Sequence, residues 1–213
     1  MSTHFQQRLP INRSAPIPSV ITGTNADLLR ACADLYLSPD DRIADLTFGR
    51  GVFWQKCPEL NVTGSDLTTV PERPYDLRST PYANNSFDVV VLDPPYIHSG
   101  KGRHITERQY RGSTVKGLSM AQIWQLYEDG MAEACRIVRP GGRILVKTAD
   151  TIESGRQRWS HIHLANVGDG MGLYLKDLLI LLRKPPCEKR WAGQKQRHSR
   201  KVTSYLLVLE AQK

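Results

Sequence analysis

Short apolar runs alternate along the chain with segments in which apolar residues recur every three or four positions. The run 89–92 is short, continuous and β-branched, which is typical of a strand buried on both faces of a parallel sheet. The segment 119–138 places its apolar residues on one face of a helix, and Ser119 can cap its first turn. By these patterns we expect helices at 25–37, 119–138 and 157–171, and strands at 42–45, 61–67, 75–77, 89–92, 143–148, 173–182 and 202–209.

The alternation of strands and helices predicts an α/β fold, in which helices cover both faces of a mostly parallel sheet. A chain of 213 residues with 40% hydrophobic residues is long enough for one such domain with a full core. Residues 1–20 contain three prolines and little periodicity, so we expect them to form an N-terminal arm. A single domain is then expected to span residues 21–213.

The apolar run 89–92 ends in Asp93-Pro94-Pro95-Tyr96. Neither proline can donate to a sheet ladder, so the strand is expected to end in a rigid tip. The Asp93 carboxylate, the Pro94 carbonyl and the Tyr96 ring would then lie at the carboxyl end of a strand, where open α/β sheets bind ligands. The two acceptors could hold both N–H bonds of a flat amine, and the ring could stack on its base. Alternatively, the four residues are only a strand terminator.

A second candidate site begins at Asp45, at the end of the strand that precedes two glycines. Gly49 and Gly51 would let the backbone turn tightly and approach a ligand without a Cβ in the way. The turn is expected to lead into a further helix. Two glycines at this spacing can also form a plain turn.

Two further acids are candidates for binding a nucleoside. Asp66 ends the next predicted strand, about 20 residues after Asp45, a spacing that suits hydrogen bonds to ribose hydroxyls. Asp76 lies in a possible short edge strand and could meet an adenine amine. The connection between Asp66 and Asp76 contains two prolines and is too short for a crossover helix. Either acid could instead be a solvated loop carboxylate.

Together these motifs resemble the S-adenosylmethionine-dependent methyltransferases that modify exocyclic amino groups of nucleic-acid bases, whose signature is D/N-P-P-Y/F. The segment 45–51 is similar to the first motif of that family, although Leu46, Thr47 and Arg50 depart from its usual form. The resemblance covers residues 25–209. It implies a Rossmann-like class I methyltransferase fold, with a seven-stranded sheet in the order 3-2-1-4-5-7-6 and an antiparallel hairpin at one edge.

The resemblance also implies a cofactor and a set of site residues. The cofactor would be S-adenosylmethionine, and no metal would be needed. The catalytic group would comprise Asp93, Pro94, Pro95 and Tyr96. The cofactor would be bound by Asp45, Thr47, Phe48, Gly49, Gly51, Asp66, Leu67 and Asp76.

The net charge of +8 is expected of a protein that meets a polyanion, although a basic soluble enzyme would carry it too. Much of the positive charge lies in two long polar stretches, residues 97–119 and 183–201, which we expect to be basic loops that bind nucleic acid. Solvated surface loops would have the same composition. The candidate nucleic-acid contacts are Lys101, Arg103, Arg108, Arg111, Lys116, Arg190, Trp191, Lys195 and Arg197.

Composition argues against several other classes of protein. The four cysteines are scattered without a C-x-x-C pair, which supports neither a zinc site nor a disulfide framework. His161 and His163 are two residues apart in a predicted helix, so we expect packing or surface roles rather than metal binding. No stretch is long and apolar enough for a membrane span, and a cytoplasmic location is expected.

The expected function is therefore methyl transfer to an exocyclic amine of a nucleic-acid base, with adenine N6 in DNA favoured over RNA. The cofactor motif precedes D-P-P-Y, which matches the γ order of the DNA enzymes that the chain resembles. RNA base methylation at guanine N2 or adenine N6 remains an alternative. A non-catalytic nucleic-acid-binding protein with a methyltransferase fold is another, and the sequence does not indicate an oligomeric state.

Overall fold

A computed structural model describes residues 16–94, 118–183 and 197–212 of the chain. Its helices are α1 (Asn25–Tyr36), the 3-10 helix η1 (Val52–Trp54), α3 (Met120–Ile137) and α4 (Ser160–Gly170). Its strands are β1 (Val20–Thr22), β2 (Ile43–Asp45), β3 (Val62–Gly64), β4 (Phe87–Leu92), β5 (Val138–Thr148), β6 (Thr151–Glu153), β7 (Arg156–Arg158), β8 (Leu173–Leu182) and β9 (Thr203–Ala211). Within the described residues, no helix is both long and apolar enough to cross a membrane.

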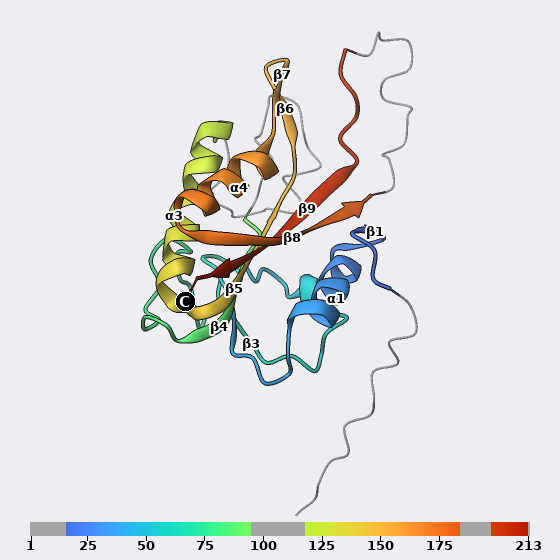
Figure 1. Ribbon diagram of the computed structural model, residues 1–213. Helices are drawn as coiled ribbons and strands as arrows, with labels where there is room; N and C mark the ends of the chain where they lie inside the picture. Colours follow the sequence, from blue (N-terminus) through green and yellow to red (C-terminus); the bar gives the residue numbers. More distant parts are fainter. Residues whose placement is uncertain (1–15, 95–117, 184–196, 213) are drawn as a thin grey trace, which may run out of the picture.

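Seven of the strands form one sheet in the order β1-β8-β9-β5-β4-β2-β3 (Figure 1). The strand β9 pairs antiparallel with both β5 and β8. The other four pairings, β1 with β8, β2 with β3, β2 with β4 and β4 with β5, are parallel. The sheet is therefore mixed, and the carboxyl ends of β2, β3, β4 and β5 lie along one edge of it, where ligand sites of α/β folds form.

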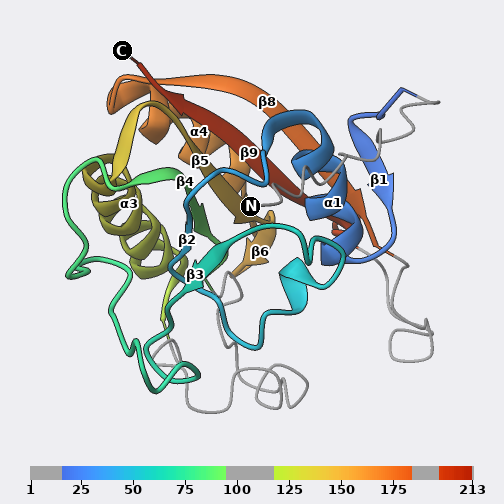
Figure 2. The same cartoon turned by 90° about the horizontal axis from the view of Figure 1, so that it is seen from below.

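Helices cover both faces of the sheet, as the sequence predicts (Figure 2). The helix α1 packs on one face, where Leu28 and Leu29 join a core that includes Val89 and Val91 of β4. The helices α3 and α4 pack on the other face against alternate residues of the same strands, such as Val90. Each fully buried aliphatic side chain contributes about 1.5–3 kcal/mol, so the two cores hold the strand ends firmly in place.

The predicted strand order is wrong at both edges of the sheet. Residues 75–77 form no strand, because Asp76 makes only an isolated bridge to Ser79. Three prolines in the connection 65–86 remove ladder donors, and the stretch between Asp66 and Asp76 is too short for a crossover helix. At the opposite edge, β1 adds a strand that the sequence did not predict, with Val20 in register with Ile180. The order of the six shared strands is as predicted.

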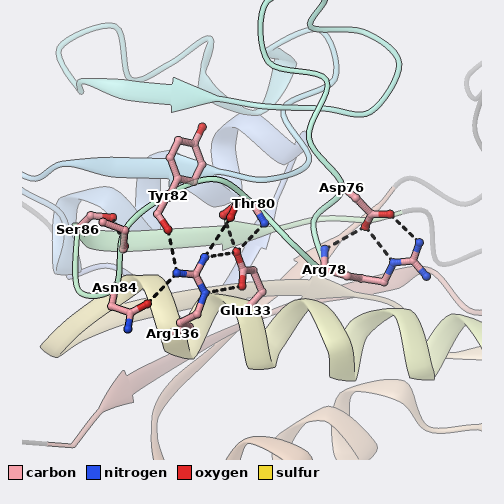
Figure 3. Close-up of polar contacts among 9 residues, drawn as sticks. Asp76, Arg78, Thr80, Tyr82, Asn84, Ser86, Glu133 and Arg136 are labelled. Carbon is pink, nitrogen blue, oxygen red and sulfur yellow. Dashed lines mark hydrogen bonds and ion pairs between the residues drawn. The ribbon is translucent and has the colours of Figure 1, made fainter.

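The connection between β3 and β4 is held against α3 by side chains instead of by a helix of its own (Figure 3). The guanidinium of Arg136 donates to both carboxylate oxygens of Glu133 at 2.6 and 2.8 Å and to the Tyr82 carbonyl at 2.8 Å. The Thr80 N–H donates to Glu133 at 2.7 Å. These charge-assisted hydrogen bonds fix a loop that has no ladder.

Several predicted boundaries also change. The helix expected after the glycines is only η1, a single 3-10 turn. The helix predicted at 157–171 begins at Ser160, because the preceding residues form the β6–β7 hairpin. A turn with positive φ at Ser154 and Gly155 closes this hairpin. The strand β5 includes the Pro-Gly-Gly residues that were expected to precede it. Ser119 caps α3 as predicted, with its hydroxyl accepting from the Gln122 N–H at 3.3 Å.

Candidate active site

The candidate site lies where the carboxyl ends of four parallel strands meet. Asp45 is the last residue of β2, Asp93 directly follows β4, and Asp66 lies two residues beyond β3. Lys147 is the penultimate residue of β5. The register pairs Leu92 with Val146, so that Asp93 and Lys147 face each other across neighbouring strands.

Thr47 joins the glycine turn to the Asp93 tip. The backbone N–H of Asp93 donates to the Thr47 hydroxyl oxygen at 2.7 Å, and that hydroxyl donates to the Asp45 carboxylate at 3.1 Å. The Leu46 N–H also donates to the Val91 carbonyl at 3.1 Å. The structure therefore brings together the two motifs that the sequence placed 46 residues apart.

The Asp45 carboxylate organises the turn from within. It is 2% exposed, and it accepts from the Trp54 indole N–H at 2.7 Å and from the Thr47 N–H at 2.9 Å. Burial raises the pKa of Asp45 to about 6, against the effect of these donors, and the negative charge of Asp93 adds to the rise. Both carboxylate oxygens bind groups of the chain itself, so Asp45 shapes the turn through its neighbours.

The glycines of the turn make room for the Phe48 ring. Gly51 has a φ of +68°, and a Cβ there would lie 2.9 Å from the ring. A Cβ on Gly64, at the end of β3, would lie only 2.3 Å from it. Gly49 also has a positive φ, of +56°. Larger residues at Gly51 and Gly64 would displace Phe48, so the requirement for glycine here is both steric and conformational.

Asp66 forms a tight turn after β3. One of its carboxylate oxygens accepts from the backbone N–H groups of Thr68 and Thr69 at 2.8 and 2.9 Å. The Thr69 hydroxyl donates to the Gly49 carbonyl at 2.9 Å, which ties this turn to the glycine turn. Burial acts to raise the pKa of Asp66, but the two N–H groups outweigh it, and the pKa lies below its usual value. Asp66 is therefore an ionised acceptor at the strand end.

Lys147 is the site residue that sequence reasoning missed. Its side chain is fully buried, and its ammonium nitrogen lies 3.7 Å from an Asp93 carboxylate oxygen. Burial raises the pKa of Asp93, whose side chain is 21% exposed, and the positive charges of Lys147 and Arg183 limit that rise. A lysine inside the apolar run 143–148, opposite an acid of the neighbouring strand, was the signal that could have indicated it.

The Pro94 carbonyl also has a neighbour within the protein. The Tyr127 hydroxyl of α3 lies 3.3 Å from this carbonyl and 2.7 Å from the carbonyl of Lys147. A hydroxyl has one proton to donate, and the shorter contact is the stronger one. Tyr127 therefore anchors the end of β5 and leaves the Pro94 carbonyl able to accept from another donor.

Comparison with known proteins gives a fold but no family. No protein-family model matches the chain, and no curated protein sequence matches it. Among solved structures, an S-adenosylmethionine-dependent methyltransferase from Methanosarcina mazei aligns with 85% of this chain and 97% of its own, with a TM-score of 0.52 at 11% identity. A protein of Bacillus halodurans C-125 described as a methyltransferase aligns over 88% of this chain and 100% of its own, with a TM-score of 0.53 at 12% identity.

A third similar structure is the 1,6-didemethyltoxoflavin N1-methyltransferase of Burkholderia thailandensis, solved with its substrate and S-adenosylhomocysteine. It aligns over 89% of this chain and 77% of its own, with a TM-score of 0.52 at 13% identity. The chain has the class I methyltransferase fold. In this fold, the strands that carry Asp45, Asp66 and Asp93 are adjacent, in the order β4-β2-β3.

Two of the predicted cofactor residues, Asp76 and Leu67, take no part in the hydrogen bonds that join Asp45, Thr47 and Asp93. Asp76 accepts hydrogen bonds from the Arg78 guanidinium on both of its oxygens, at 2.9 and 2.6 Å. The Arg78 hydrogen bonds, the largest influence, lower the pKa of Asp76. Leu67 is 43% exposed and has an apolar side chain next to Asp66. No described group of three or more histidine, cysteine or acidic residues could hold a metal.

Most of the predicted nucleic-acid contacts fall outside the described residues. Arg197 is described, and it is exposed. The predicted site residues that lie outside the described part of the chain are Pro95, Tyr96, Lys101, Arg103, Arg108, Arg111, Lys116, Arg190, Trp191 and Lys195.

Proposed function

We propose that the protein transfers a methyl group from S-adenosylmethionine to an exocyclic amine of a nucleic-acid base, with adenine N6 in DNA favoured. The observation that carries the proposal is the hydrogen-bonded junction at Thr47, which joins the glycine turn to the Asp93 tip. The methyl donor and the amine that accepts the methyl group must lie within contact distance. The Thr47 junction would place a cofactor subsite at the glycine turn beside an amine subsite at Asp93.

The residues present fit the cofactor. The oxygen of Asp66 that takes no hydrogen bond from the described residues can accept from ribose hydroxyls. The glycine turn exposes backbone without a Cβ, and the Phe48 ring and the exposed Leu67 side chain offer apolar surface to the nucleoside. When bound, S-adenosylmethionine supplies an electrophilic sulfonium methyl group. Asp45 would contribute indirectly, because its hydrogen bonds to Thr47 and Trp54 hold the glycine turn in shape.

The Asp93 carboxylate and the Pro94 carbonyl would hold the target amine. Each accepts one N–H, which favours the pyramidal nitrogen that develops as its lone pair attacks the methyl carbon. The transferred methyl group would leave S-adenosylhomocysteine behind, and Asp93 would accept the proton that the methylated nitrogen loses and pass it to water. The positive charge of Lys147 favours the ionised form of Asp93, and Thr47 fixes the backbone at Asp93. If the target lies in a duplex, its base must leave the stack.

Two measurements test the proposal. Isothermal calorimetry should detect binding of S-adenosylmethionine to the full chain. Transfer of tritiated methyl groups to DNA and RNA, followed by mass spectrometry of the nucleosides, should identify N6-methyladenine from DNA. Modified guanine or adenine from RNA would select the RNA alternative, and binding without any transfer would support the non-catalytic one.

A substitution tests the role of Asp93. Asp93→Ala should abolish transfer while the affinity for S-adenosylmethionine stays nearly unchanged. Asp169→Ala, at an exposed position of α4, is the matched control and should behave as the unaltered protein does. Transfer by Asp93→Ala at the rate of the control would refute the assigned role.

A further inference from the structure

An exposed tryptophan lies just before α4, on the side of the sheet where β5 ends. The side chain of Trp159 is 47% exposed to solvent. The ammonium nitrogen of Lys201 lies 4.5 Å from the centroid of its indole ring. An exposed indole with a cation over its face joins a stacking surface to a positive charge, which are the two features that bind single-stranded nucleic acid.

This pair lies at the same edge of the sheet as the candidate active site. Tyr205 of β9 pairs with Thr148 at the end of β5, one residue beyond Lys147. The Tyr205 ring stacks on His161, which in turn meets the Trp159 ring edge-on with centroids 6.4 Å apart. Two strand spacings, roughly 10 Å, separate the backbones of β4 and β9 at this edge. A nucleic-acid strand whose target base reaches Asp93 would therefore pass close to Trp159.

The Trp159 ring meets a stacked pair of partly buried rings edge-on. His161 and Tyr205 are stacked at 4.1 Å with an angle of 17° between their rings. The Nδ1 atom of His161 lies 2.7 Å from the carboxylate of Asp150, whose side chain is 1% exposed. This packing fixes the rings in place before a ligand arrives, which reduces the entropy lost on binding.

The two chain segments that carry the pair also contain further positive charges. The exposed Arg156 belongs to the β6–β7 hairpin that leads to Trp159, and the exposed Arg197 lies four residues before Lys201. The acids of the segment are already bound within the protein, since Glu153 pairs with Arg158 at 2.8 Å and Asp150 pairs with His161. No acid among the described residues forms an ion pair with Arg156 or Arg197, so these cations can bind phosphates.

We propose that Trp159 and Lys201 form a platform for a single-stranded segment of nucleic acid next to the target base. A base or sugar stacks on the indole, and the Lys201 ammonium binds a phosphate. An unstacked base is required, so the platform selects single strands or locally opened duplexes over intact duplex. This inference rests on the proposed function for the nature of the substrate, and it adds a second binding surface beside the reacting base.

The test measures binding of fluorescent 20-nucleotide single strands of DNA and RNA, and of the matching duplex, by anisotropy at several salt concentrations. Trp159→Ala should weaken binding of a single strand about tenfold, as expected for the loss of one stacked base. Trp159→Phe should retain most of the affinity, because it keeps a ring at this position. Lys201→Gln should reduce the slope of log affinity against log salt by about 0.7.

Matched controls lie near the start of β8, at the other end of the strands from the candidate site. Tyr174→Ala removes a 55% exposed ring from β8, and Lys176→Gln removes a cation from the same strand. Both should bind the oligonucleotides as the unaltered protein does. Circular dichroism and calorimetry with S-adenosylmethionine verify that every variant is folded.

The outcomes separate the platform from the proposed function. If Trp159→Ala and Lys201→Gln bind single strands as tightly as the two controls do, the platform is refuted while methyl transfer can still occur. Equal loss of single-strand and duplex affinity would also refute the selectivity. If the unaltered protein binds S-adenosylmethionine but no oligonucleotide, then both the platform and the nucleic-acid substrate are refuted.

Discussion

The buried lysine beside Asp93 gives the sharpest prediction about the pH dependence of activity. Replacing Lys147 by Met removes a charge 3.7 Å from the Asp93 carboxylate and keeps most of the side-chain volume. At that distance, two unit charges attract by about 4.5 kcal/mol at an effective dielectric constant of 20. Since 1.36 kcal/mol corresponds to one pKa unit, and since Asp93 keeps some contact with water, we expect its pKa to rise by about 1–3 units.

The activity should follow the ionisation of this carboxylate. The ionised form of Asp93 is the stronger acceptor for the N–H and the form that can take a proton, so the acid limb of kcat/KM should move to higher pH by the same 1–3 units. Activity should recover toward the unaltered level at high pH. Methyl transfer from tritiated S-adenosylmethionine, measured between pH 5 and about 9.5, gives this profile. Lys147→Arg should restore the original limb, and Lys176→Met serves as a control for loss of a lysine elsewhere.

The stability of the Lys147→Met variant should change with pH in a defined direction. Removing one partner of a buried ion pair costs about 3–5 kcal/mol when the other partner stays charged. The folded-state pKa of Asp93 lies above its unfolded value, so this penalty is present above the folded pKa and is relieved as the pH falls through it. Urea unfolding at several pH values measures it. An unchanged acid limb together with unchanged stability would refute the reasoning.

Two further predictions concern the packing beside the glycine turn and the titration of two carboxylates, Asp45 and Asp88. Gly64→Ala should push the Phe48 ring aside, because the new Cβ would lie 2.3 Å from it. Calorimetry should then show binding of S-adenosylmethionine weakened at least tenfold. The control Gly170→Ala, whose Cβ would meet open space, should bind normally, and equal affinities of the two variants would contradict the packing described for Phe48. Carbon-13 NMR of the carboxyl groups should find Asp45 titrating near pH 6 and Asp88, paired with two arginines, near pH 2. Midpoints near 4 for both would contradict the burial described for Asp45.

The parts of the fold that sequence could predict are those that depend on local pattern. Residues 89–92 are apolar on both faces of the strand, and residues 173–182 are mostly apolar, so both segments can be recognised as strands in the sequence. Ser119 caps α3 because its hydroxyl and the following N–H groups are neighbours along the chain. The candidate ligand-binding edge follows from local pattern too, since Asp93 comes directly after a strand that prolines terminate.

The parts that sequence could not predict depend on contacts between distant residues. The strand β1 exists because Val20 pairs with Ile180, and its three residues have no pattern of their own. The strand β7 takes the first two residues of the helix predicted at 157–171, because the pairing of β7 with β6 outweighs helix propensity there. Lys147 gained its place in the candidate site only when the register of β4 and β5 put it beside Asp93.

The outermost strands of the seven-stranded sheet, β1 and β3, have three residues each. An unpaired strand edge can recruit a strand from another molecule, and longer edges recruit more readily. Each outer strand here offers too few free backbone groups to template such growth. Engineered variants that lengthen either outer strand should therefore aggregate more readily than variants that lengthen loops.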